Sequence, residues 1–149
     1  GAVFGPSIGA QAEAQNIAMI TKMINGKVPM VPDVAMGMID VRDVAKLHVK
    51  ALTAKAAAGK RFIAASAAPV AMTHVAAVLR NAGYNKAPTM KAPSVILKMM
   101  GWVDREAKGM LPFLGKKASF DNQSTFEILD WNPTPIEKSL VEMAAGISK

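Results

Sequence analysis

The stretch Gly37–Leu52, GMIDVRDVAKLHVKAL, constrains the fold most, because a strand pattern runs directly into a helical pattern. Met38–Val41 is a short apolar run around Asp40, after which the apolar period changes from two residues to about 3.6. We expect Asp40 to cap the helix, since its carboxylate can accept hydrogen bonds from amides of the first turn. Asp43 adds a negative charge beside the positive end of the helix dipole. The pattern predicts a strand followed at once by a helix.

The faces of this helix follow from the spacing of its apolar residues. The residues that we expect on the buried face are Val44, His48, Ala51 and Leu52, with Ala45 at its edge. The residues that we expect to face solvent are Lys46, Lys50 and Thr53. A histidine on an apolar face is more often a packed core residue than a catalytic one. Helix capping explains two acidic residues at the start of a helix more simply than acid-base catalysis does, so we interpret Asp40 and Asp43 as capping groups rather than a catalytic pair.

Further strands and helices follow the same two periodicities. The predicted strands are Gly1–Gly5 and Arg61–Ser66, the second continuously apolar, which suits burial on both faces. The predicted helices cover residues 11–25, 72–84, 94–114, 120–131 and a last helix that starts near residue 134. Thr73 is the expected cap of the second of these helices. Thr134, with Pro135 at the first helical position and Glu137 closing a capping box, is the expected start of the last helix.

The composition places limits on the class of protein. A chain of 149 residues with 51% hydrophobic content can bury a core, and its length suggests one domain. No apolar run approaches the roughly 18 to 20 residues that span a bilayer, and no basic region precedes a signal core at the start. We therefore expect no membrane partner and a cytoplasmic location. The absence of cysteine excludes disulfides and thiolate metal ligands, and no metal-binding pattern is present.

The net charge of +7 raises the question of an anionic partner. The basic residues are scattered, and the densest group comprises Lys46, Lys50, Lys55, Lys60 and Arg61. The chain has two tryptophans, one tyrosine and five phenylalanines, which are not interleaved with basic residues as a base-stacking surface requires. A nucleic-acid partner is therefore disfavoured. A non-enzymatic basic binding module for another anionic partner stays open as an alternative, and its binding would depend steeply on salt.

Three ordered segments resemble one known family. IDVRDVAKLHVKAL resembles the strand-to-helix segment late in extended short-chain dehydrogenases/reductases, which include nucleotide-sugar epimerases and dihydroflavonol-4-reductase-like enzymes. The opening GAVFGP resembles the tail of that family's Asn-Pro-x-x-Val-x-Gly-Pro segment. SFDNQSTFEILDWNPTPIEKSLVEMA resembles the closing pattern of helix, Gly-Trp-x-Pro and final helix, with Asp130 in place of the glycine.

The resemblance implies an α/β fold, the C-terminal portion of a Rossmann-like extended short-chain dehydrogenase/reductase with mostly parallel strands and covering helices. The family's Gly-x-x-Gly-x-x-Gly turn is missing, since Gly1, Gly5 and Gly9 have the wrong spacing. Its Tyr-x-x-x-Lys pair is missing too, because Tyr84 is followed four residues later by Pro88. We therefore expect residues 1–149 to form a single C-terminal, substrate-side portion that includes the last core strands. The cofactor-binding N-terminal part of the same protein would be a missing partner.

The family also implies a function and a set of site residues. We expect a fragment of a NAD(P)-dependent oxidoreductase that reduces a small-molecule carbonyl substrate, or alternatively part of a nucleotide-sugar epimerase/dehydratase. NAD or NADP would bind the parent enzyme, with no cofactor expected for this chain alone and no catalytic residue within it. The resemblance implies cofactor contact by Gly1, Ala2 and Val3 and substrate contact by Pro6, Ser7 and Ile8. The alternative role of these residues is a strand end followed by a turn.

Overall fold

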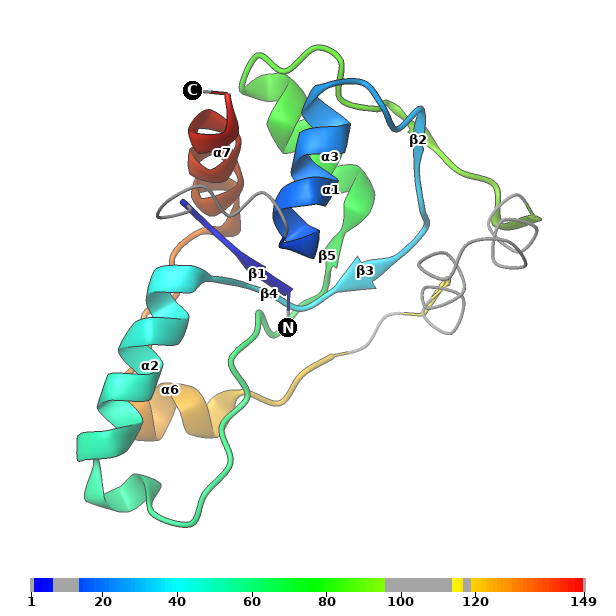
Figure 1. Cartoon of the computed structure of the whole chain (residues 1–149). Coiled ribbons are helices and arrows are strands. Elements are labelled where there is room, and N and C mark those ends of the chain that lie inside the picture. The colour runs from blue at the N-terminus through cyan, green and yellow to red at the C-terminus, as the bar shows by residue number, and fades with distance from the viewer. Residues whose placement is uncertain (1, 7–13, 96–113, 117–118, 149) are drawn as a thin grey trace.

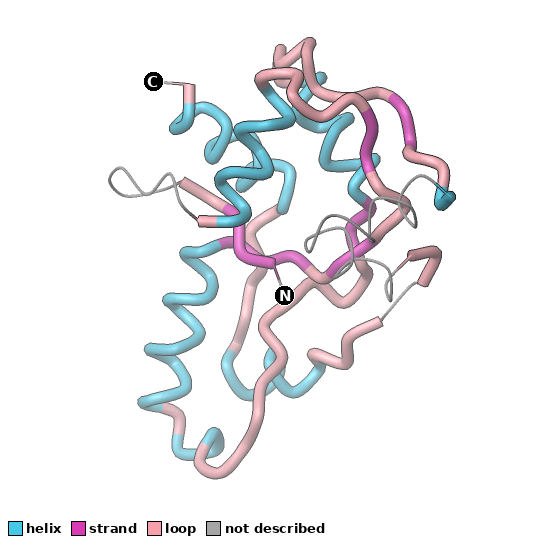
Figure 2. The backbone as a smooth tube through the Cα atoms, turned by 45° about the vertical axis from the view of Figure 1, so that its right-hand side comes forward, coloured by secondary structure: helices cyan, strands magenta, loops and turns pink. Residues whose placement is uncertain are grey.

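The computed structural model describes residues 2–6, 14–95, 114–116 and 119–148, which form short strands and longer helices (Figures 1 and 2). The helices are α1 (Gln15–Ile24), α2 (Val41–Thr53), η1 (Lys55–Ala57, a 3-10 helix), α3 (Met72–Asn81), α6 (Gln123–Leu129) and α7 (Ile136–Ile147). The strands are β1 (Ala2–Phe4), β2 (Met30–Val31), β3 (Ala35–Met36), β4 (Met38–Asp40), β5 (Val70–Ala71) and β6 (Met90–Lys91).

The strands pair in three short ladders, two of which are parallel. β1 pairs with β4 in parallel, with Val3 opposite Ile39, and β2 pairs with β6 in parallel. β3 pairs with β5 in antiparallel orientation. The expected combination of mostly parallel strands with covering helices is therefore confirmed. The predicted strands at the start of the chain and at Met38–Val41 are confirmed as β1 and β4; β4 ends at Asp40, one residue before the predicted end, and α2 begins at Val41, directly after the predicted cap.

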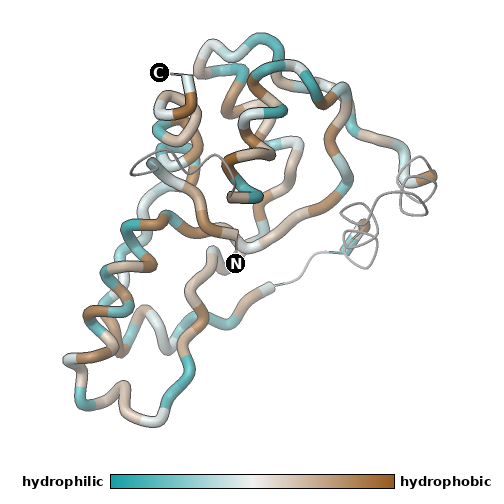
Figure 3. The backbone as a smooth tube through the Cα atoms, viewed as in Figure 1, coloured by the Kyte–Doolittle hydropathy of each residue, from teal (hydrophilic) through white to brown (hydrophobic). Residues whose placement is uncertain are grey.

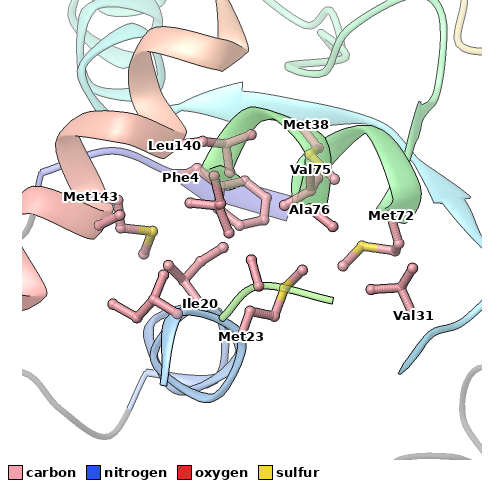
Figure 4. Close-up of a cluster of buried hydrophobic side chains, with 14 of the residues drawn as sticks. Phe4, Ile20, Met23, Val31, Met38, Met72, Val75, Ala76, Leu140 and Met143 are labelled. Atoms are coloured by element: carbon pink, nitrogen blue, oxygen red, sulfur yellow. The ribbon is translucent and has the colours of Figure 1, made fainter. Parts of the chain in front are cut away.

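The β1–β4 pair separates two hydrophobic cores, because alternate strand residues point to opposite faces. Figure 1 shows α1, α3 and α7 on one side of the pair and α2 and α6 on the other. Phe4 and Met38 point into the first core, and Ile39 points into the second. Figure 4 shows the first core, whose fully buried members include Phe4, Ile20, Val75, Leu79, Leu140 and Ala144. The second core contains Ile39, Leu47, Ala57, Leu129 and Trp131.

The buried face of α2 was predicted only in part: Val44 and Ala51 pack against the second core as expected, whereas His48 and Leu52 do not. Asp43 and Leu47 are its buried residues, whereas His48 is exposed and Leu52 is 87% exposed. Figure 3 shows that hydrophobic and hydrophilic residues alternate along this helix, so the sequence offers apolar residues on both sides. The side that packs inward is the one on which Asp43 bonds to Thr134. The prediction that His48 is a packed core residue is therefore wrong.

The predicted strand Arg61–Ser66 is also wrong. The segment passes beside β4, but its ladder contact is a single bond from the Ser66 amide to the Met38 carbonyl (2.9 Å). The Ile63 carbonyl accepts a bond from the Thr125 hydroxyl (3.0 Å), and the Ala65 carbonyl accepts one from the Asn122 side-chain amide (2.8 Å). Side chains at the start of α6 thus satisfy carbonyls that a neighbouring strand would otherwise use.

The remaining helix predictions differ in their ends. α1 ends at Ile24 as expected, before Gly26 with a φ of 72°, whereas residues 11–13 lie outside the described residues. α3 is capped at Ala71 without a side-chain bond, so the cap prediction for Thr73 is wrong. α6 is shorter than the predicted helix over residues 120–131. Most of the helix predicted over residues 94–114 lies outside the described part of the chain.

Gly37, which lies between β3 and β4, provides a test of the packing of this backbone against Phe120 and Ala65. A Cβ atom at this position would lie 2.7 Å from Phe120 Cε2 and 2.9 Å from Ala65 Cβ. Gly37→Ala should therefore lower the free energy of unfolding by about 2 kcal/mol, the usual cost of overpacking. Gly146→Ala in α7 is the matched control, because a Cβ there meets no atom within 4 Å and alanine favours helix. Urea unfolding measures both; equal effects of the two substitutions would contradict this account.

Asp130 provides a second test, because it has a left-handed backbone with a φ of 44°. Its carboxylate pairs with Lys50 (3.2 Å) but is fully exposed, so that pair contributes little. Glycine adopts this backbone without the penalty that a Cβ carries. We expect Asp130→Gly to be more stable than Asp130→Ala by about 1 kcal/mol, since both remove the carboxylate and only one removes the Cβ. Thermal unfolding of the two variants decides it, and an alanine variant at least as stable would refute the argument.

Candidate functional site

The carboxyl ends of β1 and β4 form the candidate site. Ligands of open α/β sheets bind outside the carboxyl ends of parallel strands. β1 ends at Phe4 and β4 ends at Asp40, and the two residues are opposite each other. Gly5 follows with a φ of 134°, and a Cβ there would lie 2.8 Å from Val41 Cγ1. Glycine therefore lets the chain leave β1 close against the start of α2.

The residues that the resemblance implies for the cofactor lie partly in β1. Ala2 and Val3 are half-buried strand residues, and Gly1 lies outside the described residues. Ala2 packs against the first core and Val3 against the second, so their side chains are used in packing. The Val3 carbonyl accepts a bond from the Asn16 side-chain amide (2.9 Å). Cofactor contact by these residues stays a prediction.

The residues that the resemblance implies for the substrate begin immediately after this strand. Pro6 is half-buried and follows Gly5 at the carboxyl end of β1. Ser7 and Ile8 lie outside the described residues. Substrate contact by the three residues stays a prediction, and the structure brings Pro6 to the same strand end as Asp40.

Asp40 is the most heavily bonded polar group at this strand end. It is completely buried, and its carboxylate accepts bonds from the Arg42 amide (2.7 Å), from Arg42 Nε (2.9 Å) and Nη2 (2.7 Å), and from the Ser139 hydroxyl. The cap prediction for Asp40 is therefore confirmed. The Arg42 guanidinium lowers the pKa of Asp40 to about 2; Ser139 also lowers it, and burial opposes both. Asp40 therefore remains ionised at neutral pH and cannot supply a proton there.

Arg42 is a structural link between α2 and α7. One side of its guanidinium binds Asp40, and Nη2 also pairs with the Glu142 carboxylate (2.7 Å). The bond to Asp40 raises the pKa of Arg42 above its ordinary value. From the sequence, this arginine could either meet an anionic substrate or face water. The structure instead places its guanidinium between two carboxylates of the chain itself.

Asp43 holds the residue that precedes α7. Its buried carboxylate accepts bonds from the Thr134 amide (2.6 Å) and hydroxyl (2.9 Å), across 91 positions of sequence. The predicted capping box at Thr134 is therefore wrong: the cap of α7 is Pro135, without a side-chain bond. Glu137 instead bonds to His74 (2.9 Å). No sequence signal pointed to the Asp43–Thr134 contact, because its partners are far apart in the chain.

The two histidines do not form a site with these groups. His48 is exposed, and its Nδ1 lies 2.7 Å from the Val44 carbonyl of the same helix. His74 lies in the first turn of α3 with a half-exposed side chain, and its hydrogen bond to Glu137 lowers the pKa of that carboxyl. Within the described ranges no cluster of three potential metal ligands occurs. Among the same residues, none of the helices has the length and apolar character needed to cross a membrane.

The link made by Asp40 should depend on pH. Its pKa is lowered from 3.8 to about 2, so its contribution to stability is complete above about pH 4 and is lost as the pH falls towards 2. Asp40→Asn keeps a cap acceptor but leaves Arg42 without that charge. We expect the variant to be about 2 kcal/mol less stable near neutral pH, because a pKa lowered from 3.8 to about 2 corresponds to a stabilisation of that size, and Arg42 keeps its pair with Glu142.

Urea unfolding of the wild type and Asp40→Asn at several pH values measures this link. The difference between the two proteins should shrink as the pH falls below about 4. Glu127→Gln is the control, because it removes an exposed carboxylate whose one bond is to Gln123 on the same helix. A difference between wild type and Asp40→Asn that stays constant down to about pH 3 would argue against the ionised link.

Comparison with known proteins places this geometry in a known fold. The yeast methylglyoxal/isovaleraldehyde reductase Gre2, solved with NADPH, matches with a TM-score of 0.70 and 22% identity over 99% of this chain and 44% of its own length. The structure of gox2253 matches with a TM-score of 0.75 and 19% identity over 99% of this chain and 47% of its own. A putative epimerase from Burkholderia cenocepacia J2315 matches with a TM-score of 0.64 and 16% identity over 98% and 44%.

These matches are structural. No protein-family model matches the chain, and no curated protein does. The chain spans less than half the length of the solved structures that it matches. Their identities are all below 25%, so they establish architecture rather than activity. The resemblance read from the sequence is confirmed at this level: the chain has the fold of the C-terminal portion of Rossmann-like extended short-chain dehydrogenases/reductases.

Proposed function

We propose that this chain is the substrate-side portion of a NAD(P)-dependent reductase that acts on the carbonyl group of a small or medium apolar molecule. The observation that carries the proposal is the match over 99% of the chain to a reductase solved with NADPH. The carboxyl ends of β1 and β4, where parallel sheets bind ligands, supply the location. Residues 1–149 would form a single portion of the complete enzyme, with the cofactor-binding part in the remainder of the protein.

The contacts of the carboxylates among the described residues favour a structural rather than a catalytic role for this portion. Four carboxylates, Asp40, Asp43, Glu137 and Glu142, make contacts with other residues of the chain. Groups bonded in this way hold elements together and are poor proton donors at a carbonyl. The proton for the carbonyl oxygen would therefore come from a group outside this portion, the hydride would come from the reduced nicotinamide, and Gly1, Ala2 and Val3 would contribute backbone contacts to the nicotinamide end of the cofactor. Pro6, Ser7 and Ile8 would border the substrate.

A nucleotide-sugar epimerase or dehydratase is the second candidate, because a putative epimerase shares the fold. The two candidates differ in substrate. The full-length protein should oxidise NADPH or NADH with aldehyde or ketone substrates such as methylglyoxal and isovaleraldehyde. Activity confined to nucleotide sugars would refute the reductase.

In the full-length enzyme, Ser7→Ala should raise KM for the carbonyl substrate more than KM for the nicotinamide cofactor, since the residue is assigned to the substrate side.

Residues 1–149 alone should bind neither NADH nor NADPH with micromolar affinity. A few backbone contacts at one end of a dinucleotide rarely offset the entropy lost on immobilising it. The glycine-rich turn that receives the pyrophosphate has no counterpart in this sequence. Calorimetric titration of the purified chain with each cofactor tests this, with the full-length protein as the positive control. Micromolar binding by the chain alone would show that these residues hold a complete cofactor site.

A further inference from the structure

The edge of β1 that faces away from β4 carries the backbone groups of Val3. Among the described residues, β1 pairs with β4 alone. The Ala2 amide donates to the Gly37 carbonyl (2.8 Å), so the peptide groups of Ala2 face β4. Because these groups alternate in direction along a strand, the N–H and C=O of Val3 point to the opposite edge. Val3 is also a residue whose backbone the proposed function assigns to the nicotinamide end of the cofactor.

The side chain of Asn16 reaches this edge from α1. Its Nδ2 donates a hydrogen bond to the Val3 carbonyl (2.9 Å) across 13 positions of sequence. Asparagine near a helix start usually serves as the cap. Here the cap of α1 is Ala14, which makes no side-chain bond, and Asn16 is the second residue of the helix. The Asn16 amide thus satisfies a strand carbonyl rather than a group of its own helix.

Apolar packing on both sides of this bond fixes the two elements that it joins. Ile20 of α1 is fully buried in the first core, and Phe4, the neighbour of Val3 in β1, is buried in the same core. A side chain on a packed helix holds its partner more precisely than one on a loop. The bond from Asn16 therefore fixes the direction of the peptide group between Val3 and Phe4 within an arrangement that packing already supports.

We propose that Asn16 is a positioning residue for the nicotinamide: by holding the Val3 carbonyl, it sets the orientation of the strand backbone that the cofactor contacts. This inference rests on the proposed function. Asn16 acts through Val3 and supplies no reacting group. A small displacement of the β1 backbone would move the nicotinamide relative to the carbonyl substrate, and hydride transfer is sensitive to such displacements because it requires the two reacting carbons to be close and aligned.

Three variants of the full-length protein test this role. Asn16→Asp keeps the size of the side chain but replaces the donor with a carboxylate, which cannot donate to a carbonyl. The helix should tolerate this change, because a negative charge in the first turn is favoured by the helix dipole. Asn16→Ala removes the donor without adding a charge. Thr21→Val is the matched control, since it removes a bond to the Ile17 carbonyl (2.8 Å) that stays within α1.

Calorimetric titration compares the affinity of each variant for two ligands. One is the reduced cofactor, NADPH or NADH, and the other is ADP-ribose with the same 2′ substituent, which lacks the nicotinamide. Both Asn16 variants should bind the reduced cofactor about fivefold more weakly, the usual effect of one hydrogen bond, and should bind ADP-ribose as the wild type does. Their kcat with methylglyoxal should fall at least about tenfold. Thr21→Val should change none of these quantities.

A purely structural role for Asn16 gives a different result. Urea unfolding would then show lower stability, while the affinities for the two ligands would be unchanged or would fall by the same factor, and either result would overturn the positioning role. A wild type that binds both ligands, together with Asn16 variants that match it in affinity and kcat, would overturn this inference alone. A wild type that binds neither ligand and reduces no carbonyl compound would refute the proposed function, and the role of Asn16 with it.

Discussion

The buried Asp40 carboxylate is the interaction on which the arrangement of the helices depends. Asp40 is the last residue of β4. Its carboxylate caps α2 by accepting a hydrogen bond from the Arg42 amide, and it accepts another from the Ser139 hydroxyl of α7. α2 covers the second core and α7 covers the first, so one group connects the helices on both sides of the β1–β4 pair. An ionised group is tolerated at this depth because a guanidinium, an amide and a hydroxyl satisfy its oxygens.

A two-stranded pair is a small partition between two cores, and it would be marginal in isolation. The side chains of β1 and β4 are buried by helices on both faces, and the polar contacts from Asp40 and Asp43 fix α7 in relation to α2. The close approach at Gly5 and Gly37 adds to this, since a Cβ at either position would collide with a neighbouring side chain. Packing and hydrogen bonding therefore specify the same arrangement, which is the condition for a unique fold.

Sequence reasoning predicted the features that depend on neighbouring residues. The change from strand to helix at Asp40 and its cap are local, and the sequence sufficed for both. The prediction for α2 was right for Val44 and Ala51 and wrong for His48 and Leu52, because apolar residues lie on two sides of the helix and the contact of Asp43 with Thr134, 91 positions away, selects one of them. The predicted strand Arg61–Ser66 was wrong because Asn122 and Thr125 bind its carbonyls from about 60 positions away.

For the candidate site, the sequence predicted some residues by resemblance but not the contacts of the polar groups around them. Ala2, Val3 and Pro6 were assigned by resemblance; Ala2 and Val3 lie within β1, and Pro6 follows its carboxyl end, the kind of position where such folds bind ligands. The roles of the polar groups around that end could not be assigned from spacing, because Arg42, Ser139 and Glu142 come together only in three dimensions. Each of these groups is hydrogen-bonded or ion-paired with another group of the chain, so these interactions stabilise the fold. A portion whose polar groups are engaged with one another can form one side of a substrate pocket but does not need to supply the reacting groups. The proposed function requires this arrangement, since it assigns the cofactor and the proton donor to the remainder of the protein.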